Sequence, residues 1–225
     1  MSIHLHRDLE RLQKRIVTMA GDVEEMIEKV VKALFNRDAA LAHALMQADN
    51  LIDMEENQIE EDCLKILALH QPVAIDLRRV TAILKINSDL ERMGDLAENI
   101  AERVYSLTQN ADPVPISPLF QQMADLTNMM VRDGLDAFVN LDSSLAKRVC
   151  RVDEEVDRLN VEIIKLVLEY MKKNPNHVEP GLNLFSICRQ IERIADHATN
   201  IAEDVVYLVE GAIIRHHPEA LKEME

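Results

Sequence analysis

The sequence predicts an all-α protein built from two tandem, pseudo-symmetric three-helix bundles, with six long antiparallel helices. Residues 90–104, LERMGDLAENIAERV, return as IERIADHATNIAEDV at 191–205, with nine of fifteen positions identical, so one helical unit occurs twice. Of the 225 residues, 48% are hydrophobic, 3% are aromatic, and only five are glycine and seven proline. This composition favours cores of Leu, Ile, Val, Met and Ala at helical spacing.

The first unit is expected to span residues 1–112, where caps and prolines divide the chain. The expected helices run over 3–35, over 38–70 and, after Pro72, up to about residue 110. Asp38 is of a residue type that caps helix N-termini, so it opens the second helix. Pro72 cannot continue that helix, because proline lacks the backbone N–H and clashes with the preceding turn.

The second unit is expected to span residues 113–225. Its prolines near the helix ends are Pro113, Pro115, Pro118, Pro175 and Pro180. The first three crowd the boundary between the units, and the last two bracket the final turn. Ser117 followed by Pro118 has the form of an N-cap and a first-turn proline, opening a fourth helix to about residue 140. Asp142 caps the fifth helix, and the sixth runs to about Gly211.

The repeat extends beyond the opening motif and gives the two units the same order of helices. ALFNRDAALA at 33–42 aligns with AFVNLDSSLA at 137–146, which matches Asp38 with Asp142 as the capping residue. Short connections make sequential helices antiparallel neighbours. Each unit is therefore predicted to be an elongated three-helix bundle.

Charge and cysteine content exclude several classes of function. The formal net charge of −15 would repel a phosphate backbone, so nucleic acid is not an expected partner. The first residues offer no apolar secretory segment, and no apolar run reaches membrane-spanning length. The three cysteines, Cys63, Cys150 and Cys188, lack metal-type spacing and make a disulfide framework improbable. A cytoplasmic location is expected.

Each unit carries a stripe of oxygen-bearing side chains on its third helix. The matched residues are Glu91, Asp95, Asn99 and Glu102 in the first unit, and Glu192, Asp196, Asn200 and Glu203 in the second. Their spacing of four, four and three keeps them on one side of a helix. A solvated acidic face is one interpretation, because an amphipathic helix needs a polar side. Against it, like charges four residues apart cost about 0.2–0.5 kcal/mol a pair.

A second pair of acids recurs on the neighbouring helix of each unit. Asp49 and Asp53 stand four residues apart, and their counterparts are Asp153 and Asp157. Two acidic pairs per unit could converge on one cation, whose charge would turn their repulsion into attraction. Oxygen ligands suit Mg²⁺, Mn²⁺, Ca²⁺ or iron, whereas Zn²⁺ usually recruits His or Cys. His197 follows Asp196 directly but points about 100° away from it, so it is a weak candidate ligand.

Three long segments carry a family resemblance. They read GDVEEMIEKVVKAL at 21–34, IDMEENQIEEDCLKILALHQP at 52–72 and QPVAIDLRRVTAILKINSDLERMGDLAENIAE at 71–102. In this order, and with the twofold repeat, they closely resemble the PhoU family of phosphate-uptake regulators. The resemblance covers essentially the whole chain. It implies a cytosolic protein of two three-helix bundles, with a homodimer as the expected assembly.

The resemblance also implies function. Members of this family act beside the phosphate ABC transporter and its sensor histidine kinase, so the chain is expected to be a negative regulator of phosphate uptake and phosphate-starvation signalling. The expected partners are the transporter's ATPase subunit and that kinase. Family members carry Glu/Asp-x-x-x-Asp motifs that hold metal ions, and the four motifs here are intact. In the second unit HVEPGLNLF replaces the DLRR region, so an interaction through that segment would belong to the first unit only.

Two other classes of protein remain as alternatives. A carboxylate-bridged di-iron enzyme also uses an acidic helical bundle, but it relies on Glu-x-x-His pairs, which do not occur in this chain. A helical scaffold whose acidic stripes only face solvent would need no metal. No nucleophile elbow or phosphate-cradling Gly-rich loop is present, so the chain is not expected to be an enzyme.

Overall fold

The computed structural model describes residues 3–47, 50–110 and 112–211, and within them the chain forms helices and no strands. The α-helices are α1 (Ile3–Asn36), α2 (Ala39–Leu45), α3 (Asn50–His70), α4 (Ala74–Thr108), α5 (Leu119–Asn140), α6 (Ser143–Lys173) and α7 (Val178–Glu210). A short 3₁₀ helix, η1 (Pro175–His177), joins α6 to α7. The predicted all-α class is confirmed.

The predicted second helix is wrong in one respect, because the structure divides it into α2 and α3. α2 ends at Leu45, and its C-cap is Met46. α3 begins at Asn50, a residue type that competes for backbone hydrogen bonds and so starts helices better than it continues them. The predicted cap at Asp38 is confirmed, since its side chain accepts a hydrogen bond from the Leu41 backbone N–H at 2.9 Å.

The ends of α5 and α7 differ only slightly from the predicted helix ends. α5 has Pro118 as its N-cap instead of Ser117, whose hydroxyl accepts a hydrogen bond from the Leu119 N–H at 3.3 Å. Pro180 lies in the first turn of α7, where a missing N–H costs nothing. Gly211 caps α7 in the left-handed conformation, as expected for a C-terminal glycine.

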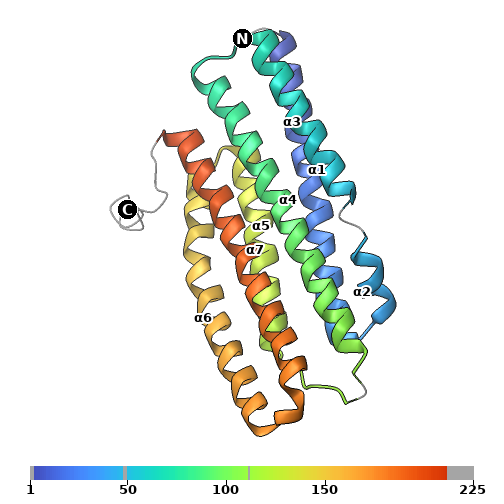
Figure 1. Cartoon of the computed structure of the whole chain (residues 1–225). Helices are drawn as coiled ribbons and strands as arrows, with labels where there is room; N and C mark the ends of the chain where they lie inside the picture. The colour runs from blue at the N-terminus through green and yellow to red at the C-terminus, as the bar shows by residue number, and fades with distance from the viewer. Residues whose placement is uncertain (1–2, 48–49, 111, 212–225) are drawn as a thin grey trace.

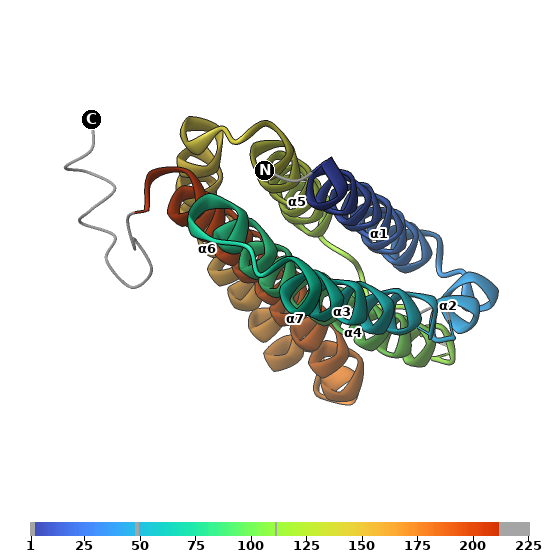
Figure 2. The ribbon, with the colours of Figure 1, turned by 90° about the horizontal axis from the view of Figure 1, so that it is seen from above.

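The helices pack so that equivalent helices of the two units meet. α1, α3 and α4 pack on one another, as do α5, α6 and α7, and the units join through α4 against α7 and α1 against α5. Figure 1 shows α4 and α7 side by side and antiparallel in the middle, with α3 beyond α4 and α6 beyond α7. Figure 2 shows α1 and α5 together along the opposite side of the bundle. This arrangement gives the molecule a pseudo-twofold axis.

The α4–α7 contact fixes the register of the two units. Lys85 Nζ lies 2.6 Å from Asp204 Oδ1 near one end, and the Asn183 amide donates to Ser106 Oγ at 3.2 Å near the other. Continuing this antiparallel register to the middle sets Gly94 opposite Ala195, both of which are buried.

The core and surface agree with the composition. The buried residues are almost all aliphatic and run along every helix in one continuous cluster that includes both units. The three cysteines are free. Across the described residues, no helix has both the length and the apolar composition required to cross a bilayer.

Candidate metal centre

The acids of the second unit lie on two helices that pack against each other, α6 and α7. Asp153 and Asp157 come from α6, and Glu192 and Asp196 come from α7. Glu192 is buried, with 9% of its surface exposed, whereas Asp157 and Asp196 are exposed. One oxygen of Glu192, Oε1, accepts a hydrogen bond from Arg189 at 2.7 Å. The other, Oε2, is buried and has no hydrogen-bond partner among the described residues.

Burial and mutual repulsion make these carboxylates hard to ionise. Burial raises the pKa of Asp153 to about 6, and the charges of Asp157 and Asp196 add to that rise. Burial, followed by the charge of Asp196, also raises the pKa of Glu192. The pKa of Asp196 is raised by burial and by Asp157. The cluster therefore holds negative charge that a cation would stabilise.

The corresponding acids of the first unit are compensated by an arginine. Asp53 on α3 and Glu91 and Asp95 on α4 are all partly exposed. Arg92 donates to Asp95 Oδ2 at 3.0 Å, and its Nε lies 3.5 Å from Glu91 Oε2. Burial raises the pKa of Glu91, and Asp95 adds to the rise, whereas Arg92 opposes it. Asp49, the fourth predicted ligand, lies outside the described residues.

The four residues predicted as an additional metal shell make other contacts. The Asn99 amide donates to the backbone oxygen of Asp95 at 2.7 Å. The Asn200 amide donates to Asp89 of α4 at 3.4 Å, away from the acidic pair. Glu102 is exposed, and its charge acts on Glu98. Glu203 is near Cys150, whose thiol pKa is raised to about 12 by burial first and by this carboxylate next.

His197 does not join the acidic cluster either. Its Nδ1 lies 2.7 Å from Asp89 Oδ1, so the ring faces α4. Among the described residues, no group of three or more His, Cys, Asp or Glu side chains is placed to hold a metal ion. The acids of both clusters supply the oxygen atoms that hard cations prefer, and Glu192 Oε2 is a buried oxygen without a hydrogen-bond partner among the described residues.

Two contributors to these clusters were missed in the sequence. Glu56 of α3 has a pKa raised by burial and then by the charges of Glu60 and Asp53, so it belongs to the first cluster. The repeat hid it, because its counterpart is Asn160. Arg189 was missed because it stands three residues before Glu192 on the same helix, and this spacing is common among ion pairs on exposed helix surfaces.

Comparison with known proteins gives the context for this geometry. The sequence model of one protein family, described as PhoU domain, matches residues 16–104 and 120–205. A phosphate-specific transport system accessory protein PhoU homolog from Pseudomonas putida is 36% identical over 216 residues, covering 96% of this chain and 84% of that protein. A homolog of the same description from Aquifex aeolicus is 39% identical, covering 94% and 96%.

Solved structures agree with these relatives. The crystal structure of PhoU from Pseudomonas aeruginosa superposes with a TM-score of 0.88 at 36% identity, covering 92% of this chain and 99% of that one. The phosphate transport system regulatory protein PhoU from Streptococcus pneumoniae has a TM-score of 0.86 at 31% identity, covering 93% and 98%. Family, relatives and fold agree over nearly the full length, and the chain belongs to the PhoU family.

Proposed function

We propose that this chain is a negative regulator of phosphate uptake and of phosphate-starvation signalling. Its relatives over 96% of its length are accessory proteins of the phosphate-specific transport system, and this observation carries the proposal. The regulator works by binding, without turnover, in the cytoplasm and as a homodimer. Its partners are the ATPase subunit of the phosphate transporter and the sensor histidine kinase.

A binding protein can regulate such partners only by preferring one of their states. A ligand shifts a two-state equilibrium by its difference in affinity for the two states, so the regulator must bind the phosphate-replete state more tightly. The α4–α7 and α1–α5 contacts join both units into one bundle with one aliphatic core. A rigid body of this kind can present a fixed surface to a partner.

The test of this function is capture from cells. An affinity-tagged chain is isolated from phosphate-replete cells with intact membranes, and the retained proteins are identified by mass spectrometry. Recovery of the transporter ATPase or the sensor kinase is expected. As a control, a second tagged protein with a known partner is captured under the same conditions. If that partner is retained and neither the ATPase nor the kinase is recovered with this chain, this mode of action is excluded.

Metal binding is a second part of the proposal. In the second unit Asp153, Asp157, Glu192 and Asp196 would hold the ion, and in the first Asp49, Asp53, Glu91 and Asp95. Support comes from the unpartnered, buried oxygen of Glu192 and from the raised pKa of Asp153. When bound, the ion supplies positive charge that offsets the repulsion between carboxylates on neighbouring helices. With the ion bound, these residues would hold α6 against α7 and α3 against α4.

Elemental analysis tests this part directly. The wild type and a variant combining Glu91→Gln, Asp95→Asn, Glu192→Gln and Asp196→Asn are chelated exhaustively and then exposed to Mg²⁺, Mn²⁺, Ca²⁺, Zn²⁺ or iron. We expect the wild type to retain metal after gel filtration and the variant to lose it. Equal occupancy in both would remove these positions from the site.

A further inference from the structure

The row of oxygen-bearing side chains on α4 begins one turn before the acids identified in the sequence. Asn87, Glu91 and Asp95 stand four residues apart on this helix, so they lie within about 80° of one another. Burial increases toward the start of the row. The side chain of Asp95 is 36% exposed and that of Glu91 is 18% exposed, whereas Asn87 as a whole residue is 2% exposed. Asn87 is therefore the deepest member of the row.

The amide of Asn87 is satisfied at its nitrogen but not at its oxygen. The nitrogen, Nδ2, donates to the backbone oxygen of Glu56 on α3 at 2.9 Å. A backbone oxygen can only accept a hydrogen bond, so this contact determines which end of the amide faces the main chain of α3. Asn87 Oδ1 is buried and has no hydrogen-bond partner among the described residues. A buried oxygen of this kind usually meets an ordered water or an ion.

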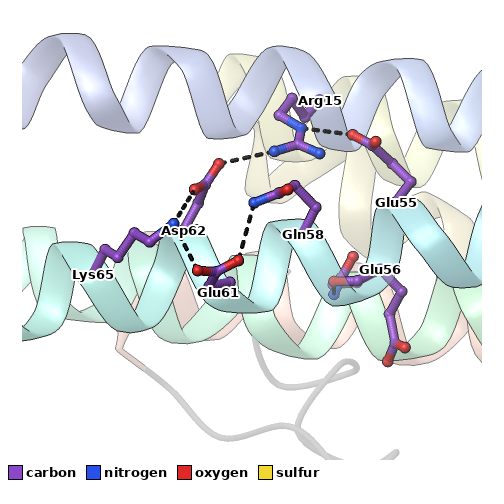
Figure 3. A network of polar contacts seen from close by, with 8 residues as sticks. Arg15, Glu55, Glu56, Gln58, Glu61, Asp62 and Lys65 are labelled. Carbon is purple, nitrogen blue, oxygen red and sulfur yellow. Dashed lines mark hydrogen bonds and ion pairs between the residues drawn. The ribbon is translucent and has the colours of Figure 1, made fainter.

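The residue that holds the Asn87 amide belongs to the first acidic cluster. The pKa of Glu56 is raised by burial and then by neighbouring carboxylates that include Asp53, although Arg92 opposes this rise. Figure 3 shows the Glu56 side chain directed away from Arg15, so that arginine does not neutralise it. The oxygen of Asn87 therefore lies next to acids that repel one another, and a cation in this position would be stabilised by the acids and by the amide oxygen together.

The second unit differs at the same two positions of the repeat. Cys188 of α7 stands where α4 has Asn87, and Asn160 of α6 stands where α3 has Glu56. The Cys188 thiol donates to Asn160 Oδ1 at 3.2 Å, so the amide oxygen at this place in the second unit already has a partner. The buried oxygen without one is instead a carboxylate oxygen, Glu192 Oε2. Of these two matched positions, only the first unit's leave a buried amide oxygen available.

We propose that Asn87 Oδ1 is a ligand of the cation held by the first unit, together with the acids of that cluster. This inference rests on the metal-binding part of the function proposed above and adds a residue to the site. Amide oxygens are ordinary ligands of hard cations, and a neutral ligand adds no charge to acids that already repel one another. Cys188 cannot supply this oxygen, so the two units hold their ions with different sets of ligands.

An ordered water is the competing partner of Asn87 Oδ1. A buried water that donates to this oxygen would satisfy it and would give Asn87 a structural role only. The two roles differ in a measurable way. A structural contact stabilises the protein equally with and without the ion, whereas a ligand changes the affinity of the protein for the ion.

The experiment measures the affinity of the first unit for Mn²⁺, an ion that accepts oxygen ligands. The second-unit site is first removed from the full chain by Asp153→Asn, Asp157→Asn, Glu192→Gln and Asp196→Asn, which gives the parent chain. Mn²⁺ is titrated into this chain, and the free ion is measured by its electron paramagnetic resonance signal. The test variant of the parent is Asn87→Leu, which is similar in shape and lacks the oxygen. Asn87→Asp restores an oxygen at the same position.

The matched control is Asn128→Leu in the same parent chain. Asn128 of α5 is also buried, at 9% exposed, and its Oδ1 also lacks a partner among the described residues. It lines a groove between α1 and α5, on the other side of the bundle from the acidic clusters (Figure 2). Both variants therefore replace a buried amide that has a free oxygen, and only one of them lies at the candidate site. Urea unfolding in the absence of metal checks that both variants fold.

We expect Asn87→Leu to bind Mn²⁺ about 10- to 100-fold more weakly than the parent chain, because the ion loses an oxygen contact. Asn87→Asp should bind at least as tightly as the parent, and Asn128→Leu should bind within about threefold of it. Equal affinities of Asn87→Leu and the parent, or equal losses in the two Leu variants, would overturn the role of Asn87 and leave the metal site standing. No Mn²⁺ binding by the parent chain would overturn both this inference and the first-unit site.

Discussion

His197 Nδ1 of α7 lies 2.7 Å from Asp89 Oδ1 of α4, across the contact that joins the two units. Neither residue is repeated, because the counterpart of His197 is Leu96 and that of Asp89 is Gln190. Both side chains are largely buried. The pseudo-symmetric contact therefore contains a pair found once, which adds to the Lys85–Asp204 and Asn183–Ser106 contacts between α4 and α7.

Removal of His197 should weaken the joint between the units. Among the described residues, His197→Leu leaves the Asp89 carboxylate with the 3.4 Å contact to Asn200. We expect the free energy of unfolding in urea to fall by about 1–3 kcal/mol, because a mostly buried acceptor loses its main partner. Adding Asp89→Ala to this variant should recover part of the loss. A loss below about 0.3 kcal/mol in the single variant would show that the pair does not hold the units together.

The stability of the metal-free protein should depend on pH through Asp153. Its folded pKa of about 6 lies above the ordinary value of 3.8, so the unfolded chain ionises first as pH rises. Asp153 therefore does not lower the free energy of unfolding below about pH 4. The destabilisation grows between about pH 4 and pH 6 and is complete above pH 6. We expect Asp153→Asn to stabilise the chelated protein by about 1–2 kcal/mol at pH 7.5, after allowing for solvent screening, and by almost nothing at pH 4. Urea unfolding at both pH values checks this, and an equal effect at both would contradict it.

Two glycines should respond to alanine in opposite directions. A Cβ on Gly181 would overlap Met171 Cγ, whereas one on Gly21 would have no atom within 4 Å. We expect Gly181→Ala to destabilise the protein by about 1–3 kcal/mol through overpacking. Gly21→Ala should stabilise it by about 0.5–1 kcal/mol, because it restricts the unfolded chain in a helical position. The urea midpoints of the two variants measure these effects. If both midpoints rise, the Met171 side chain moves away from a Cβ at residue 181 at little cost, which would contradict the prediction.

Arg15 should matter more than an exposed arginine with as many partners. It donates to Glu55 at 2.6 Å and to Asp62 at 2.8 Å on α3, and its side chain is 19% exposed (Figure 3). We expect Arg15→Met to lower the free energy of unfolding by about 1–3 kcal/mol, since Glu55 loses its basic partner and Asp62 keeps only the longer 3.6 Å contact to Lys65 among the described residues. The control is Arg158→Met, because Arg158 pairs with Glu155 and Glu162 on one exposed helix face. That change should cost less than about 0.5 kcal/mol. Similar losses of stability in the two variants would show that Arg15 stabilises the protein through its hydrocarbon chain and not through its ion pairs.

The helices and their caps could be predicted because local residues determine them. Asp38 and Asp142 cap helices in both units, and each accepts a hydrogen bond from the N–H three residues later. The break between α2 and α3 could not be predicted, because the apolar spacing continues through it. Only the poor helix-forming tendency of Asn50 indicates it, and tertiary packing often overrides that tendency.

The sequence identifies the candidate acidic residues but not the environment of each one. Glu91 and Glu192 are equivalent in the sequence and each lies beside an arginine, Arg92 or Arg189. Glu192 is nevertheless buried with one oxygen lacking a partner among the described residues, whereas Glu91 is partly exposed. This difference arises from which helices and side chains cover each position, and a repeat alignment does not contain that information. The left-handed backbone of Ala74, with φ 49°, is likewise invisible in the sequence, because alanine is not a residue type that favours this conformation.

The most direct measurement of the regulatory role is the output of a phosphate-responsive reporter in cells from which this chain has been deleted. A negative regulator predicts that the reporter stays on in high phosphate and that the wild-type chain, supplied in trans, switches it off again. A reporter that high phosphate still represses fully in the deleted strain would contradict the account.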